Sequence, residues 1–157
     1  MPIEEGKAAP AFSLPDQDGT TVSLADFKGK KNVVLYFYPK DDTPGCTKEA
    51  CGFRDLGRDF ARLDTVVLGV SADSGESHRK FIGKYKLPFT LLSDVSKKVM
   101  ERYGAWGEKM MYGQKKIGVI RSSVVIGKDG KVLKHWKKVP QADIHPEKVL
   151  AALGELL

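Results

Sequence analysis

The chain has 157 residues and a formal net charge of +6, and 41% of its residues are hydrophobic and 29% charged. This balance is typical of a folded globular protein and excludes a disordered or fibrous one. No apolar run approaches the roughly 20 residues that a membrane-spanning helix needs. The acidic start of the chain, residues 1–5, has no apolar segment typical of a secretory signal.

The expected location is therefore the cytoplasm, where thiols are kept reduced. The chain has two cysteines, Cys46 and Cys51, separated by only four residues. In a reducing compartment, a close pair is more typical of catalysis, redox chemistry or metal binding than of a structural disulfide.

The N-terminal part of the chain predicts a β-hairpin followed by a buried strand. Residues 11–14 and 20–23 flank the turn-forming stretch 16–19, which has the sequence Asp-Gln-Asp-Gly. A nearly continuous apolar run then covers residues 32–38 and stops at Pro39. Such a run is typical of a strand in a parallel sheet that helices cover on both faces.

A helix that carries both cysteines is predicted next. Thr43 followed by Pro44 is a helix-start signal, because a threonine side chain can cap the first turn and proline fits the first helical position. We expect this helix to contain Cys46 and Cys51 and to continue to about Arg62.

The remaining elements continue the alternation of strands and helices. In order, they are a strand at 65–71, a helix capped by Asp73 or Ser74, a short strand at 89–92, a helix capped by Ser96, a long loop over 105–120, strands at 122–126 and 132–136 around an Asp-Gly turn, and a last helix from 146 to about 156. This order predicts an α/β fold with a mixed central β-sheet flanked by helices, in a single domain over residues 1–157.

Lysines gather in the C-terminal half of the chain, at Lys115, Lys116, Lys134, Lys137 and Lys138. We interpret them as a solvated face that favours solubility. The alternative is a surface for nucleic acid or an acidic protein, since Trp106, Tyr112 and Trp136 lie in the same region and could stack on bases. No nucleic-acid motif accompanies these residues, so nucleic-acid binding is not expected.

Cys46 occupies the position that sulfur chemistry requires. The thiolate is the nucleophilic form of cysteine. The first turn of a helix favours that anion, because its backbone N–H groups are unpaired and the helix dipole is positive there. Cys46 is the third residue of the predicted helix, and this helix follows the carboxyl end of a buried strand, the edge where open α/β sheets bind ligands. We therefore expect Cys46 to be both activated and accessible.

The spacing of Cys46 and Cys51 is incompatible with a disulfide in an intact helix. Five residues rise ~7.5 Å and leave the two Cα atoms roughly 8.6 Å apart. A disulfide needs about 4.4–6.8 Å. A bond between them therefore requires the turn to unwind, and Gly52 weakens the helix modestly there. The alternative is a pair of inert buried thiols.

A metal site is not expected, because zinc usually takes four ligands and Cys-x4-Cys is an unusual spacing. The three histidines, His78, His135 and His145, are scattered along the sequence, and we expect each of them at the surface.

The segment 36–51, with Pro39, Thr43 and Cys46 in a Pro-x-x-x-Thr-x-x-Cys pattern, resembles the active-site segment of peroxiredoxins. The most similar group is that of the bacterioferritin comigratory protein, or peroxiredoxin Q. Further segments that resemble it follow in order over nearly the whole chain, at 12–19, 91–94, 103–109 and 121–123.

This resemblance implies a thioredoxin-like fold with an N-terminal β-hairpin and a hydroperoxide as substrate. Cys46 would be the peroxidatic cysteine and Cys51 the resolving cysteine, which condenses with the Cys46 sulfenic acid. Thioredoxin or a similar dithiol reductant would then restore both thiols. No cofactor or metal is implied, and we expect a monomer or weak dimer. A thioredoxin-type thiol–disulfide oxidoreductase is the main alternative, but the chain has no Cys-x-x-Cys.

Four further residues have expected roles in such a site. Arg121 would stabilise the thiolate and the charge that develops on the peroxide oxygens. The Thr43 hydroxyl would orient the peroxide. Pro39 would shape the loop and shield the thiolate from water, and Glu49 would support the site by holding Arg121 in a bidentate pair.

Overall fold

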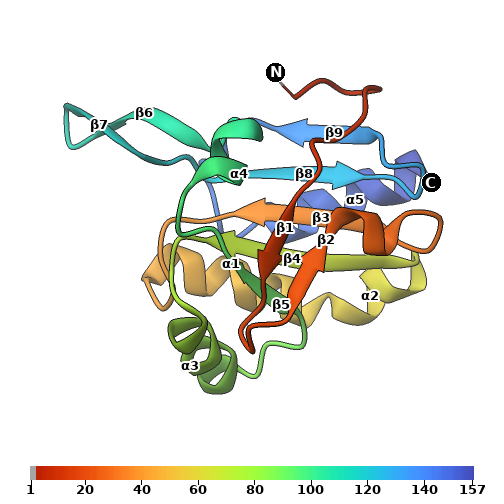
Figure 1. Cartoon of the computed structure of the whole chain (residues 1–157), viewed down its shortest axis with the longest axis horizontal. Helices are drawn as coiled ribbons and strands as arrows, with labels where there is room; N and C mark the ends of the chain where they lie inside the picture. The colour runs from red at the N-terminus through yellow and green to blue at the C-terminus, as the bar shows by residue number, and fades with distance from the viewer. Residues whose placement is uncertain (1–2) are drawn as a thin grey trace.

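The computed structural model describes residues 3–157, so Met1 and Pro2 of the acidic N-terminal segment lie outside the described residues. A five-stranded sheet forms the centre of the molecule, and its strands follow the order β5 (Thr90–Ser93), β4 (Thr65–Ser71), β3 (Asn32–Phe37), β8 (Ser122–Ile126) and β9 (Val132–Trp136) (Figure 1). Strands β3, β4 and β5 are parallel, whereas β8 is antiparallel to both β3 and β9. The expected mixed sheet is confirmed.

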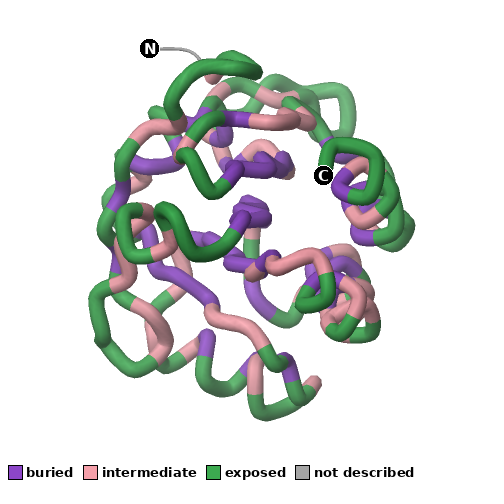
Figure 2. The backbone as a smooth tube through the Cα atoms, turned by 90° about the vertical axis from the view of Figure 1, so that its right-hand side faces the viewer, coloured by how far each residue is buried: buried purple, intermediate pink, exposed green. Residues whose placement is uncertain are grey.

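Strand β3 lies at the middle of this sheet, and its side chains alternate between two apolar cores. Val33, Leu35 and Phe37 pack into one core, while Val34 and Tyr36 pack into the other. All six residues of β3 are buried, as the continuous apolar run predicts. Figure 2 shows the buried residues gathered in the interior and the exposed ones on the outer loops and helix faces.

The two cores are covered by different elements. One face of the sheet is covered by α1 (Pro44–Asp55), α2 (Gly57–Arg62), α3 (Gly75–Tyr85) and α5 (His145–Leu156). The other face is covered by α4 (Lys98–Arg102) and by the N-terminal hairpin of β1 (Ser13–Pro15) and β2 (Thr21–Ser23), which a short helix at Leu24–Phe27 follows. This is the thioredoxin-like arrangement that the resemblance to peroxiredoxins implies.

The helix boundaries differ from the prediction in two places. The long helix expected to reach Arg62 ends at Asp55, because the backbone at Leu56 leaves the helical region (φ −97°, ψ 9°) and α2 then begins at Gly57. Ser74 caps α3 by accepting a hydrogen bond from the backbone of Ser77, as expected. In α4, however, the N-cap residue is Lys97 and not Ser96.

The predicted long loop over 105–120 is wrong. This segment forms an antiparallel hairpin of β6 (Trp106–Met111) and β7 (Gln114–Val119), which projects from the body of the molecule (Figure 1). Its turn residues, Tyr112 and Gly113, both have positive φ, which suits a two-residue hairpin turn. The hairpin is hard to recognise in the sequence because most residues of both strands are exposed or half-buried. Without a buried face, apolar and polar residues need not alternate along the strands.

Within residues 3–157, no helix is long and apolar enough to cross a membrane.

Candidate active site

Three elements meet at one edge of the sheet and place the candidate residues side by side. Strand β3 ends there, and the loop after it leads into α1. Strand β8 begins at the same edge, because it pairs with β3 in antiparallel fashion with Phe37 opposite Ser122. Arg121, which directly precedes β8, is therefore delivered to the first turn of α1, where Cys46 lies.

Cys46 is the third residue of α1, as predicted, and its side chain is in contact with Arg121. The Nη2 group of Arg121 donates a hydrogen bond to the Cys46 Sγ at 3.2 Å. The expectation of an open, accessible thiol is wrong, since only 1% of Cys46 is exposed. Arg121, which donates to this buried sulfur, retains 17% exposure of its own side chain.

Glu49 binds the other side of the same guanidinium. Arg121 Nη1 donates to Glu49 Oε1 at 2.7 Å. The expected bidentate pair is wrong, because the second guanidinium nitrogen is used for Cys46. Arg121 can approach this closely because residue 45 is glycine, where an added Cβ would lie 3.3 Å from Nη2. One arginine thus connects two groups that lie three residues apart on α1.

Burial sets the charge balance of this triad. Burial raises the pKa of Glu49 to about 7, although the charge and hydrogen bond of Arg121 oppose that shift. The second carboxylate oxygen, Oε2, is buried without a hydrogen-bond partner among residues 3–157, which accounts for the strength of the desolvation. Burial opposes the charge of Arg121 as well, but Glu49 and Cys46 outweigh it, so the pKa of Arg121 is raised.

The raised pKa of Glu49 gives a prediction about stability. Between pH 4.5 and about 7, the folded chain keeps a proton that the unfolded chain releases, so this contribution is present at low pH and is lost as the pH rises. We expect the free energy of unfolding of the wild type to fall relative to Glu49→Gln across this interval. Urea denaturation of both proteins at a series of pH values measures the difference.

The comparison with Glu49→Gln is needed because His145 titrates in the opposite sense. Burial, together with the charges of Lys148 and Arg121, lowers the pKa of His145 to about 4. Its contribution to stability is therefore lost as the pH falls. Both proteins contain His145, so it cancels in the difference. Parallel stability curves would show that Glu49 keeps an ordinary pKa in the folded chain.

Thr43 and Pro39 lie in the loop that precedes α1. Thr43 is the N-cap residue of α1, but the predicted side-chain cap is wrong. Its hydroxyl instead donates to the carbonyl oxygen of Lys40 at 2.8 Å, so its lone pairs remain available to accept a hydrogen bond. Pro39 is half-buried and directly follows Tyr38, whose backbone N–H still pairs with β4. Pro39 thus marks the end of the β3 pairing.

Cys51 lies in the same unbroken helix as Cys46, and both thiols are free. It is half-buried and lines a surface pocket of about 340 Å³ between α1 and the start of α5. At the next residue, Gly52, an added Cβ would lie 2.8 Å from Pro146 Cγ. The glycine therefore permits α5 to pack closely on α1 directly after Cys51, in addition to weakening the helix.

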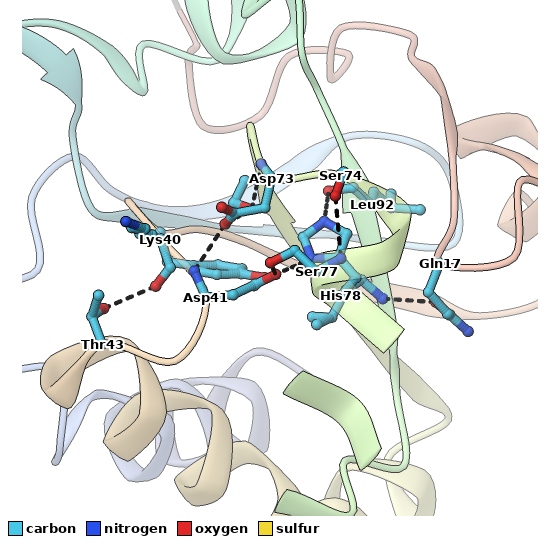
Figure 3. Close-up of polar contacts among 12 residues, drawn as sticks. Gln17, Lys40, Asp41, Thr43, Asp73, Ser74, Ser77, His78 and Leu92 are labelled. Atoms are coloured by element: carbon cyan, nitrogen blue, oxygen red, sulfur yellow. Dashed lines mark hydrogen bonds and ion pairs between the residues drawn. The ribbon is translucent and has the colours of Figure 1, made fainter. Parts of the chain in front are cut away.

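A second polar cluster lies beside the loop that carries Thr43 (Figure 3). Asp41 is buried and lies 2.7 Å from His78 Nδ1 through its Oδ2. His78 and His145 are both buried, so the expectation that they lie at the surface is wrong. His145 is tied to Ser123 Oγ at 2.8 Å, and His135 is half-buried in β9.

Asp41, Asp73 and His78 are the residues of this cluster that could hold a metal ion, since one ligand atom of each lies within 4.8 Å of the others. Hydrogen bonds already occupy these atoms. His78 uses one ring nitrogen for Asp41 and the other for the carbonyl of Leu92, and Asp73 Oδ2 accepts from two donors. We therefore interpret the cluster as a hydrogen-bonded network.

Sequence reasoning missed this network. Asp73 offered a signal, because it follows the carboxyl end of β4, the same sheet edge at which α1 begins. Nothing in the sequence connects His78 with Asp41, since they are 37 residues apart and meet only when α3 packs beside the loop.

A thioredoxin-like sheet that places an arginine on a cysteine in the first turn of a helix defines a cysteine-dependent oxidoreductase. The AhpC/TSA family model matches residues 6–135, and the chain belongs to this family. The protein is a peroxiredoxin enzyme, as its resemblance to the bacterioferritin comigratory protein group predicts.

Relatives over the full length support this assignment. The chain is 50% identical over 153 residues to the putative peroxiredoxin bcp of Coxiella burnetii, covering 98% of this chain and all of that protein. It is 47% identical to peroxiredoxin Bcp of Bacillus subtilis, and the match covers 99% of this chain and 98% of that protein.

Solved structures agree with these relatives. Peroxidoxin BcpB of Mycobacterium tuberculosis superposes with a TM-score of 0.87 at 36% identity, over 99% of both chains. The bacterioferritin comigratory protein of Xanthomonas campestris, whose structures address alkyl peroxide reduction, gives 0.88 at 35% identity, over 97% of this chain and 98% of that one.

Proposed function

We propose that this peroxiredoxin reduces hydrogen peroxide and organic hydroperoxides through Cys46, which Cys51 then resolves as an intramolecular disulfide. The observation that carries the first half of this proposal is the 3.2 Å contact between Arg121 and the Cys46 sulfur. A fixed cation against a sulfur atom in the first helical turn favours the thiolate over the thiol.

In the peroxidatic step, the Cys46 thiolate attacks the terminal oxygen of the hydroperoxide and the O–O bond breaks. The sulfur becomes a sulfenic acid, and the leaving oxygen takes up a proton as water or alcohol. Arg121 stabilises the negative charge that moves from sulfur to oxygen, and Glu49 keeps the guanidinium in place. Thr43 accepts a hydrogen bond from the peroxide, and Pro39 limits access of water.

In the resolving step, the Cys51 sulfur attacks the sulfenic acid, water leaves and the disulfide forms. In an ideal helix the Cα atoms of the two cysteines lie roughly 8.6 Å apart, so the turn between them must unwind first. Pro146 packs on Gly52, directly after Cys51, so a movement of Cys51 toward Cys46 should also disturb the contact between α1 and α5. Local unfolding of α1 is thus a required step of the cycle.

A thioredoxin-type dithiol would reduce the disulfide by thiol–disulfide exchange. We further propose that residues 1–157 act as one domain in the cytoplasm, as a monomer or weak dimer. An intrachain resolving cysteine supports the monomer or weak dimer, because the cycle then needs no sulfur from a partner subunit. No metal, haem or flavin is needed, since sulfur performs the redox chemistry.

Cys51→Ser tests the resolving role. We expect this variant to form the Cys46 sulfenic acid with the first equivalent of peroxide but not to turn over, because Cys46 has no thiol with which to condense. Mass spectrometry should show Cys46 as sulfenic acid or as its over-oxidised forms, whereas the wild type should show a product two mass units lighter than the dithiol. The coupled assay with a thioredoxin-type reductant measures turnover.

Asp55→Asn is a suitable control, since Asp55 lies near the end of the same helix and is exposed. It should turn over like the wild type. Sustained turnover by Cys51→Ser with the same reductant would mean that the reductant attacks the sulfenic acid directly, and that Cys51 is not required.

A further inference from the structure

The peptide group between Lys40 and Asp41 joins two hydrogen bonds of the active-site loop (Figure 3). Its N–H, which belongs to Asp41, donates to Asp73 Oδ2 at 2.8 Å. Its carbonyl, which belongs to Lys40, accepts from the Thr43 hydroxyl at 2.8 Å. Because a peptide group is planar and rigid, fixing its N–H also fixes the direction of its carbonyl. The orientation of the Thr43 hydroxyl is therefore linked to Asp73.

Asp73 is itself fixed to the central sheet. The hydroxyl of Ser71, the last residue of β4, donates to Asp73 Oδ2 at 2.7 Å. The backbone N–H of Asp73 donates in return to Ser71 Oγ at 3.1 Å. The carboxylate thus has a defined position relative to β4, and it passes this position on to the loop.

The side chain of Asp41 fixes the same loop from a second direction. Its Oδ1 accepts from the Tyr38 hydroxyl at 2.5 Å, and its Oδ2 accepts from the Ser77 hydroxyl at 2.8 Å and faces His78 Nδ1 at 2.7 Å. These partners come from the end of β3 and from α3. The loop is therefore tied to three elements of the fold.

His78 completes this attachment because both of its ring nitrogens face acceptors. The carbonyl of Leu92 can only accept, so His78 Nε2, at 3.1 Å, carries a proton. On the other side of the ring, Nδ1 lies 2.7 Å from Asp41 Oδ2. The ring is fully buried, and the pair connects the loop to α3 and β5 without an exposed charge. Loss of either partner would leave a buried polar group unpaired.

We propose that Asp73 and the Asp41–His78 pair are positioning residues for the peroxide step. They direct the Thr43 hydroxyl proton to Lys40, so that only lone pairs of Thr43 Oγ1 face the peroxide and accept its O–H. This inference rests on the role proposed above for Thr43. It assigns these three residues to the orientation of the substrate, not to the nucleophilicity of Cys46.

The test compares two reactions of Cys46 by stopped flow: oxidation by hydrogen peroxide and alkylation by iodoacetamide, which needs no orientation by Thr43. We expect Asp73→Ala to slow oxidation by about 10-fold and Thr43→Val by about 10- to 100-fold, because misplaced reactants lose the benefit of alignment. Alkylation should be unchanged in both variants. Asp73→Asn should restore most of the rate, since its amide oxygen can still accept from Asp41 N–H.

His78→Gln should show the same selective loss, and Glu76→Gln, an exposed change on α3, should match the wild type. If Thr43→Val oxidises at the wild-type rate, the role proposed for Thr43 is wrong. If Thr43→Val is slow but Asp73→Ala is not, the positioning inference alone is overturned. Equal slowing of oxidation and alkylation in Asp73→Ala would also overturn it, because that result indicates a general disturbance around Cys46.

Discussion

Cys46→Ser is expected to lose peroxide reduction by at least about 1,000-fold, because a serine hydroxyl is neither appreciably ionised at neutral pH nor oxidised to an analogue of a sulfenic acid. The substitution replaces sulfur by a smaller oxygen in a side chain that is 1% exposed, and Arg121 can still donate to the hydroxyl. The fold should therefore be retained. Peroxide consumption coupled to a thioredoxin-type reductant measures the loss.

Thermal unfolding of Cys46→Ser provides the necessary control, since a loss of activity has chemical meaning only in a folded chain. Cys51→Ser forms the matched variant, because it removes the other thiol of α1 and should still consume the first equivalent of peroxide. If Cys46→Ser consumed peroxide as fast as the wild type, Cys46 would not be the nucleophile, and the sulfur chemistry proposed for α1 would have to be abandoned.

The parts of this protein that can be predicted from sequence are those determined by residues close together in the chain. The apolar run of β3 and the Thr43-Pro44 start of α1 gave correct elements because burial and backbone geometry act over a few residues. Together they place Cys46 in the first helical turn. Arg121 was found through the family resemblance, and the register of β3 with β8 then explains its position.

The parts that were missed depend on partners distant in the chain. Thr43 satisfies the local rule for a helix cap, yet its hydroxyl donates to the carbonyl of Lys40. The peptide group between Lys40 and Asp41 is held in this direction by Asp73, which follows the end of β4. The burial of His78 depends in the same way on Asp41 and Leu92. Local patterns describe what a side chain can do, and tertiary packing selects among these possibilities.

The access of peroxide to Cys46 shows the same limit. Sequence places this residue at a ligand-binding edge, but it does not reveal that Cys46 is buried, with only 1% of it exposed. The guanidinium that donates to the Cys46 sulfur retains some exposure to solvent, so we expect Arg121 to affect both the stability of the thiolate and the access of peroxide. This dual position makes Arg121 the residue whose substitution should be most informative after Cys46.

Arg121→Lys is expected to slow the oxidation of Cys46 by about 100- to 1,000-fold, although the positive charge is kept. Two different nitrogens of one guanidinium bind Cys46 and Glu49, at 3.2 and 2.7 Å. A single ammonium at the end of a flexible chain cannot hold both directions at once. Single-turnover oxidation by hydrogen peroxide, followed by Trp fluorescence or by rapid quench, measures the rate.

Arg121→Gln and the double variant Arg121→Gln/Glu49→Gln separate catalysis from stability. Removing the arginine alone leaves Glu49 buried without its cation. At pH 8 the buried carboxyl must then either carry an unpaired charge or keep its proton at a pH that favours ionisation, and both cost free energy. We therefore expect the single variant to be less stable than the wild type. Replacing Glu49 as well should recover that stability without recovering the oxidation rate. Recovery of the rate in the double variant would mean that Arg121 serves only to neutralise Glu49, and that the contact with Cys46 contributes nothing to the peroxide step.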